Sequence, residues 1–142
     1  MYDKELTTQI IGYFLWKAGG AMPYLKILKL VYLADRKALL DIGETLTGDA
    51  YSAMKLGPAP YYTYNSLKQD KFDSQWLEHK KFDVRLKKEV NSNDPLDTFE
   101  LLSPIMQSIL DSIWDQYGNK RKYDLAKLTH TICPEWEACK DD

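Results

Sequence analysis

The sequence predicts an α+β domain that is predominantly helical, with about five helices, one β-hairpin and a short additional extended segment. Apolar residues recur at helical spacing in most of the chain, and apolar and polar residues alternate over 82–87. Glycine, proline and asparagine clusters separate these stretches. The 142 residues are the usual length of one domain, and we expect a single domain over 1–142.

Two helices are predicted in the first third of the chain. Apolar residues at helical spacing over 6–15 predict the first, which Gly19 and Gly20 end. Pro23 is expected in the first turn of the second helix, which Gly43 stops. Because the second helix is apolar around most of its circumference, we expect it to be the central helix of the domain.

The middle of the chain predicts mixed structure. Residues 51–54 are expected to be a short extended segment, and a helix over 61–68 follows Pro60. Alternation over 82–87, with Phe82 on the apolar side, predicts a half-buried strand. Residues 98–102 are expected to return as the second strand of the hairpin, after a turn over 91–95.

Two further helices complete the prediction. Ser103 is a good N-cap and Pro104 a good first-turn residue for a helix that ends at Gly118. Its predicted apolar face begins at Ile105. The last helix is expected to start at Asp124 as N-cap and to end before Pro134.

Composition excludes several classes of function. The net charge of −2, from 19 basic and 21 acidic residues, gives no support for direct nucleic-acid binding. The short basic clusters at 79–81 and 120–122 are interpreted as solvated surface. No apolar run suggests a signal peptide or a membrane span, so we expect a cytoplasmic protein. His130, Cys133 and Cys139 have no standard zinc spacing, and we expect neither a metal nor a cofactor.

Asp35 is the most informative polar residue, because helical spacing places it on an apolar stripe between Val31 and Leu39. A buried carboxylate without a partner is unfavourable, so we expect Asp35 to be paired. The favoured interpretation is a structural polar cluster that pins this helix to the Tyr51 segment or to the last helix. The alternative is a recognition or catalytic site.

An enzyme would need a set of reactive groups. Asp35, Arg36, Tyr51 and His130 could share a pocket, with His130 as general base. However, the chain has no identifiable nucleophile, no glycine-rich phosphate loop and no HExxH motif. We therefore expect a protein without catalytic residues.

Three tyrosines follow Pro60, at positions 61, 62 and 64. Adjacent helical positions cannot all face a core, so at least one of Tyr61, Tyr62 and Tyr64 should reach the surface. Exposed aromatic residues are enriched at protein interfaces, which makes these tyrosines candidates for partner binding.

Four blocks in order along the chain carry a resemblance to a known family, over residues 28–36, 46–58, 102–118 and 128–136. The chain resembles the SocA-like Panacea domain of bacterial antitoxins, related to phage-associated GepA-like proteins. Ala59 stands where the family pattern has valine. The motif residues that carry the resemblance, expected to form a structural cluster, are Lys29, Tyr32, Asp35, Arg36, Gly48, Asp49, Tyr51, Gly57, Pro58, Thr129, His130 and Trp136.

The resemblance implies a function. Members of this family act as antitoxins of type II toxin–antitoxin systems and neutralise toxins by direct binding. Some of these toxins resemble RelA-like nucleotide pyrophosphotransferases, and one member is thought to deliver its toxin to a protease. The expected partner is therefore a cognate toxin protein, with a role as protease adaptor or as a small enzyme as alternatives.

Overall fold

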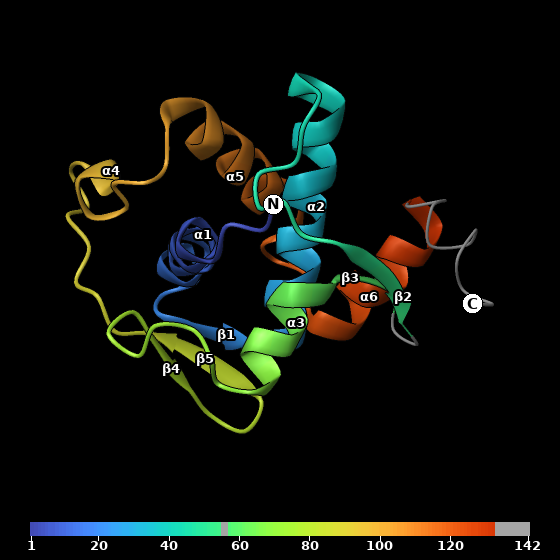
Figure 1. Cartoon of the computed structure of the whole chain (residues 1–142), viewed down its shortest axis with the longest axis horizontal. Coiled ribbons are helices and arrows are strands. Elements are labelled where there is room, and N and C mark those ends of the chain that lie inside the picture. The colour runs from blue at the N-terminus through green and yellow to red at the C-terminus, as the bar shows by residue number, and fades with distance from the viewer. Residues whose placement is uncertain (55–56, 133–142) are drawn as a thin grey trace.

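The computed structural model describes residues 1–54 and 57–132 of the chain (Figure 1). It confirms a predominantly helical α+β fold. In chain order the elements are α1 (Lys4–Lys17), β1 (Ala21–Pro23), α2 (Tyr24–Ile42), β2 (Tyr51–Met54), β3 (Gly57–Pro60), α3 (Tyr61–Lys68), β4 (Leu77–His79), β5 (Asp83–Leu86), α4 (Pro95–Thr98), α5 (Pro104–Tyr117) and α6 (Lys122–Ile132).

Local sequence signals explain the ends of the long helices. The Asp3 carboxylate caps α1 by accepting a hydrogen bond of 3.0 Å from the Leu6 N–H. Gly43 ends α2 with a left-handed φ of 82°, as expected for a C-terminal glycine. Pro23 was predicted inside the first turn of α2 but lies one residue before it, because it also ends strand β1.

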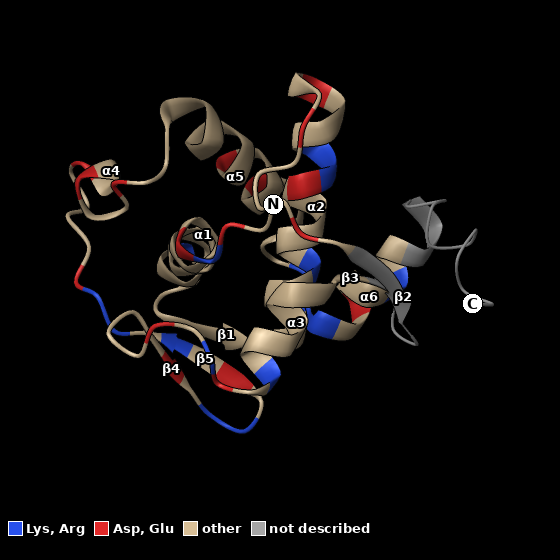
Figure 2. Cartoon of the chain, viewed as in Figure 1, with Lys and Arg blue, Asp and Glu red and all other residues tan. Residues whose placement is uncertain are grey.

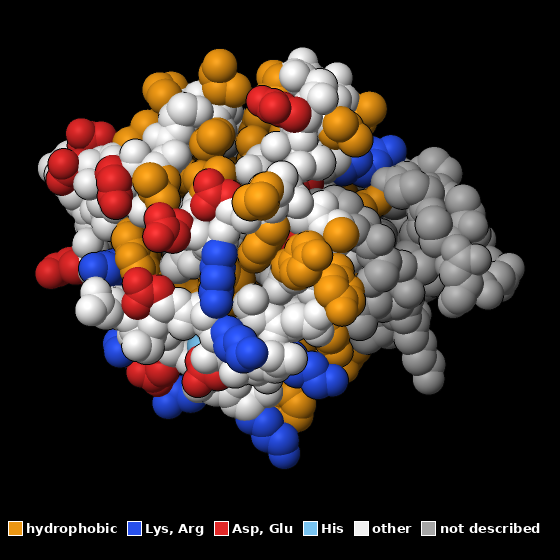
Figure 3. All heavy atoms as spheres, in the orientation of Figure 1, with side chains coloured by type: hydrophobic (Ala, Val, Ile, Leu, Met, Phe, Trp, Pro, Cys, Tyr) orange, Lys and Arg blue, Asp and Glu red, His pale blue; other side chains and the backbone are white. Residues whose placement is uncertain are grey.

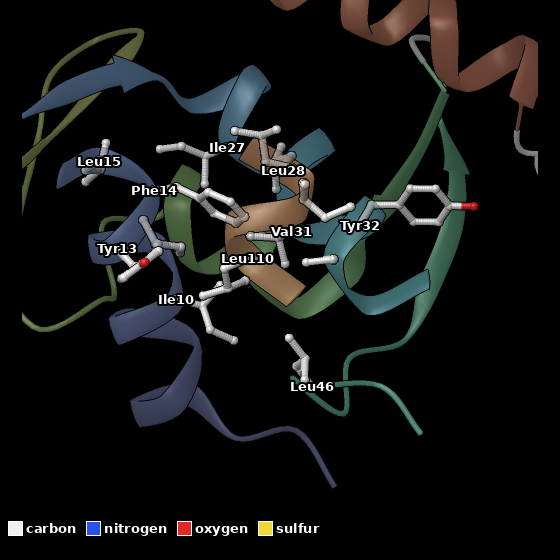
Figure 4. Close-up of a cluster of buried hydrophobic side chains, with 14 of the residues drawn as sticks. Ile10, Tyr13, Phe14, Leu15, Ile27, Leu28, Val31, Tyr32, Leu46 and Leu110 are labelled. Carbon is white, nitrogen blue, oxygen red and sulfur yellow. The ribbon is translucent and has the colours of Figure 1, made fainter. Parts of the chain in front are cut away.

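Helix α2 is the central element, as its apolar circumference predicts. It contacts α1, α3, α5, α6, β1 and β3, and in Figure 1 it runs through the middle of the molecule. Its side chains meet those of α1 and α5 in the core, where Ile10, Phe14, Val31 and Leu110 are completely buried (Figure 4). The N-terminal helix is buried almost as fully, since every residue from Leu6 to Leu15 is buried.

The strands form two small antiparallel sheets. Strand β5 lies between β1 and β4, with Val84 opposite both Met22 and His79. The predicted extended segment is strand β2, which pairs with β3 so that Tyr51 lies opposite Pro60. The second hairpin strand was predicted at residues 98–102, and this prediction is wrong. Both strands that pair with β5, namely β1 and β4, come before β5 in the chain.

Phe99 explains why residues 98–102 turn inward without pairing. Its N–H donates to Pro95 O at 2.9 Å and its carbonyl accepts from the Leu102 N–H at 3.0 Å, so the backbone bonds close local turns. Its ring is completely buried and packs edge-on against Tyr13, with ring centroids 5.5 Å apart. Residues 98–102 therefore contribute apolar side chains to the core from local turns. The same apolar composition is typical of a strand, which is why the sequence predicted one here.

Three further predictions at the edges of elements are wrong. Helix α6 starts at Lys122, so Asp124 lies in its first turn and is not the N-cap. Ile105 is 61% exposed although it was placed on the apolar face of α5. Phe82 is 58% exposed because β5 begins one residue later, at Asp83.

The described part of the chain has neither a membrane-spanning helix nor a cluster of metal ligands. No helix there combines the length and apolar character needed to cross a membrane. No group of three or more histidine, cysteine or acidic residues there is arranged to hold a metal ion. Cys133 and Cys139 lie outside the described residues.

Candidate functional site

The Asp35 carboxylate is buried and fully engaged with the segment that follows α2. Asp35 is 1% exposed. Its Oδ1 accepts hydrogen bonds from the backbone N–H groups of Leu46, at 2.8 Å, and Thr47, at 3.0 Å. Its Oδ2 accepts from the Thr47 hydroxyl. Such bonds are what a buried carboxylate requires, so Asp35 holds the 46–47 segment against α2.

The network continues from Thr47 to helix α3. Thr47 Oγ1 accepts from the Asp49 N–H at 3.1 Å. The Asp49 carboxylate accepts from the N–H groups of Tyr62, at 2.8 Å, and Thr63, at 2.9 Å, and from the Thr63 hydroxyl at 2.6 Å. Pro60, the N-cap residue of α3, has no side chain that could do this. A carboxylate also interacts favourably with the positive end of the helix dipole.

We call Asp35, Thr47, Asp49 and Thr63 the polar network. Its four side chains are buried or nearly so, and it joins α2 to the first turn of α3 through a continuous run of hydrogen bonds. Sequence reasoning found Asp35 and Asp49 but missed Thr47 and Thr63. Only the tertiary structure shows that Thr63 lies beside Asp49, because 14 residues separate them in the chain.

Tyrosines on the outer side of this junction form an exposed group. Tyr61 and Tyr62 are each 47% exposed, and their ring centroids lie 5.2 Å apart. Tyr2 packs against Tyr62 at 5.4 Å, and its hydroxyl lies 3.2 Å from Thr63 Oγ1. Burial raises the pKa of the Tyr2 hydroxyl above its usual value. We call Tyr2, Tyr61 and Tyr62 the tyrosine surface; apolar side chains gather on this face around the N-terminus and α3 (Figure 3).

Tyr64 differs from its neighbours. It is half-buried and packs against the hydrophobic core. Lys68 lies over its ring, with the ammonium 5.6 Å from the ring centroid. The sequence grouped Tyr64 with Tyr61 and Tyr62, but its burial against the core leaves it less accessible than these two tyrosines.

The other motif residues lie mainly around α2. Lys29 and Tyr32 are almost completely buried, and the Tyr32 ring lies on the β2–β3 side of the core, opposite the side chains of α1 (Figure 4). Arg36 is half-buried. Thr129 is completely buried on α6, where its hydroxyl donates to Ala126 O at 2.7 Å.

Part of the predicted cluster can be placed only by its backbone. Tyr51, Gly57 and Pro58 belong to the β2–β3 hairpin and His130 to α6, and both α6 and β3 pack against α2. The side chains of these residues, and Trp136 as a whole, lie outside the described part of the structure. The tertiary structure thus brings the described parts of all four motif blocks together around α2, since α5 also packs against this helix.

A steric reason explains why glycine occupies motif position 48. Its φ of 72° is left-handed, and an added Cβ would lie 2.3 Å from the backbone oxygen of Met1. The N-terminal residues run close beside it, since the Asp3 N–H donates to Thr47 O at 2.8 Å. Glycine at position 48 therefore lets the N-terminus, including Tyr2, pack beside the polar network.

Replacing Gly48 by alanine should destabilise the fold more than the same replacement at a glycine with free space around its Cα. We expect Gly43→Ala, at a φ of 82° with nothing within 4 Å of the new Cβ, to lower the free energy of unfolding by about 1–2 kcal/mol. Gly48→Ala should lose about 2–4 kcal/mol, because overpacking adds to the same backbone strain. Urea denaturation of both variants measures the difference in the free energy of unfolding. Equal losses would show that the steric clash with Met1 does not destabilise the Gly48→Ala variant.

Comparison with models of known protein families identifies the family of this chain. The family described as antitoxin SocA-like, Panacea domain, matches residues 27–137. The chain belongs to this family. In this Panacea domain the matched range contains the whole polar network, whereas α1 and β1 precede it. Comparisons with curated proteins and with solved structures gave no match.

Proposed function

We propose that this Panacea domain is the antitoxin of a type II toxin–antitoxin pair and that it neutralises a cognate protein toxin by binding it directly. The family supports an antitoxin role in general. Toxins that resemble RelA-like nucleotide pyrophosphotransferases are the first partners to test. Such a complex would form in the cytoplasm, where these toxins act.

The tyrosine surface is the observation that supports direct binding. Tyrosine side chains offer a large amphipathic contact area and lose little conformational freedom on binding, which is why they are enriched at interfaces. Tyr61 and Tyr62 lie in the first turn of α3, whose backbone N–H groups Asp49 holds from another segment. The polar network thus presents these two rings in a defined position before any partner arrives.

The same network supports a function without catalysis. Both oxygens of Asp35 accept hydrogen bonds from the 46–47 segment, and both oxygens of Asp49 accept from α3. A general base needs a carboxylate that can approach the proton of a substrate. These two acids are instead saturated by the protein itself, so we assign them to the scaffold that positions the tyrosine surface.

Co-expression tests the proposal. The chain and the product of the neighbouring gene are expressed from separately inducible promoters in a bacterial host, and growth is recorded. We expect the neighbour alone to stop growth and the pair to restore it, with both proteins recovered in one complex. A neighbour that is harmless, or growth that this chain does not restore, would contradict the proposal.

A further inference from the structure

A hollow of about 250 Å³ opens beside the first two turns of α1, separate from the polar network. Its lining comes from α1 and from the segments before β4 and after α4, namely Glu5, Thr8, Gln9, Asp73, Trp76, Glu100 and Leu101. We call it the α1 hollow. Pockets for drug-sized ligands are larger, roughly 300–1,000 Å³, so its volume suits one large side chain.

The charge of the α1 hollow is one-sided. Glu5, Asp73 and Glu100 line it, and within the described part of the chain none of these carboxylates lies at ion-pair distance from a basic group. Asp73 does accept a hydrogen bond of 2.9 Å from the Gln75 N–H. Acidic residues gather at the start of α1 and around α4, away from the basic β4–β5 turn (Figure 2). A cationic group is the complementary ligand.

Gln9 adds a requirement that a simple cation does not meet. It is only 3% exposed, and its Oε1 accepts the Leu101 N–H at 2.9 Å, which fixes the orientation of its amide. Its Nε2 makes no hydrogen bond to a described residue. Because Gln9 lines the hollow, its Nε2 is the N–H donor there that has no acceptor among the described residues.

A fixed N–H donor beside three carboxylates calls for a ligand with an acceptor next to its positive charge. A metal ion offers no acceptor for this donor. A basic residue within a peptide offers both, because its carbonyl oxygen accepts a hydrogen bond while its side chain carries the charge. The exposed Leu101, at 42%, adds an apolar rim of the kind seen at protein interfaces.

The three carboxylates favour arginine among the basic residues. A guanidinium is planar and pairs with carboxylates through two parallel hydrogen bonds. The Trp76 ring forms a wall of the hollow and already has its own contacts, with the Lys88 ammonium 5.0 Å from its centroid and the Phe99 ring centroid 5.8 Å away. We propose that the α1 hollow receives an arginine side chain of a partner protein, with Gln9 donating to a carbonyl of the same segment.

The identity of that partner rests on the proposed function: it would be the toxin. Glu5 follows Tyr2 by three residues, so the α1 hollow and the tyrosine surface both adjoin the N-terminal segment. The hollow would contribute a charged contact next to the aromatic one. A toxin that inserts arginine here would be held through two neighbouring sites.

A titration with a peptide tests the hollow without the toxin. The ¹⁵N-labelled full chain is titrated with Ac-Gly-Arg-Gly-NH₂ while NMR follows the Gln9 side-chain amide, the Leu101 N–H and the Trp76 indole N–H. We expect saturable shifts at all three. The double variant Glu5→Gln/Glu100→Gln should bind the peptide about tenfold more weakly or worse, because it loses charge-assisted hydrogen bonds.

The controls separate a specific site from general attraction between charges. The double variant Asp115→Asn/Asp124→Asn removes the same charge from exposed positions outside the hollow and should bind like the wild type. Ac-Gly-Gln-Gly-NH₂ should not bind. Absent shifts, equal weakening in both double variants, or equally tight binding of spermidine would overturn the proposal. A chain that fails to restore growth would contradict the antitoxin role but leave this titration readable.

Discussion

Replacing Asp35 by alanine is expected to lower the free energy of unfolding by about 3–5 kcal/mol. The truncation leaves the buried N–H groups of Leu46 and Thr47 and the Thr47 hydroxyl without their acceptor. Because Asp49 and α3 depend on the position of Thr47, the loss should spread to the far end of the network. Urea denaturation followed by circular dichroism measures the change.

Asp41→Ala is the matched control on the same helix. The Asp41 side chain is 48% exposed and pairs with Lys37 at 2.9 Å, one turn away. Exposed pairs of this kind contribute about 0.3–0.5 kcal/mol. A loss below about 1 kcal/mol for Asp35→Ala, within the usual range of surface substitutions, would show that Asp35 does not hold the scaffold together.

Removal of two rings from the tyrosine surface should abolish protection against the toxin. We expect Tyr61→Ala/Tyr62→Ala to raise the Kd of the toxin complex by about 1,000-fold, because central interface tyrosines contribute about 2 kcal/mol each. Folding should change little, since neither ring belongs to the hydrophobic core. Isothermal titration calorimetry gives the Kd, and the co-expression assay gives the effect on growth.

Tyr123→Ala provides the control for this experiment. Tyr123 is 61% exposed, more than either tyrosine of the pair, and lies on α6 outside the tyrosine surface. Its loss should leave both the Kd and the rescue of growth unchanged. Normal binding by the Tyr61→Ala/Tyr62→Ala variant, or equal damage from Tyr123→Ala, would move the toxin interface elsewhere.

Long helices could be predicted because their signals are local. The predicted signals at Gly43 and Ser103 act within one turn of the backbone, and in the structure Gly43 ends α2 and Ser103 caps α5. The expectation that Asp35 has hydrogen-bond partners followed from burial alone, since an isolated buried carboxylate is unfavourable.

The sheet could not be predicted in the same way. Strands β1 and β4 have three residues each, too few to show alternation. The buried Phe99 led to the wrong prediction of a strand, because apolar residues occur both in buried turns and in strands. Strand pairing depends on contacts between segments that are distant in the sequence. Only the tertiary structure shows that β1 and β4 are the segments that lie beside β5.

For this Panacea domain, helix positions, the burial of Asp35 and the presence of exposed tyrosines are all readable in the order of the residues, because each depends on neighbours within a few positions. The meeting of Asp49 with Thr63, of Tyr2 with Tyr62, and of Gln9 with Leu101 depended on folding, since 14 to 92 residues separate the partners. Contacts of that range follow from how the helices pack, and the candidate sites are made of such contacts.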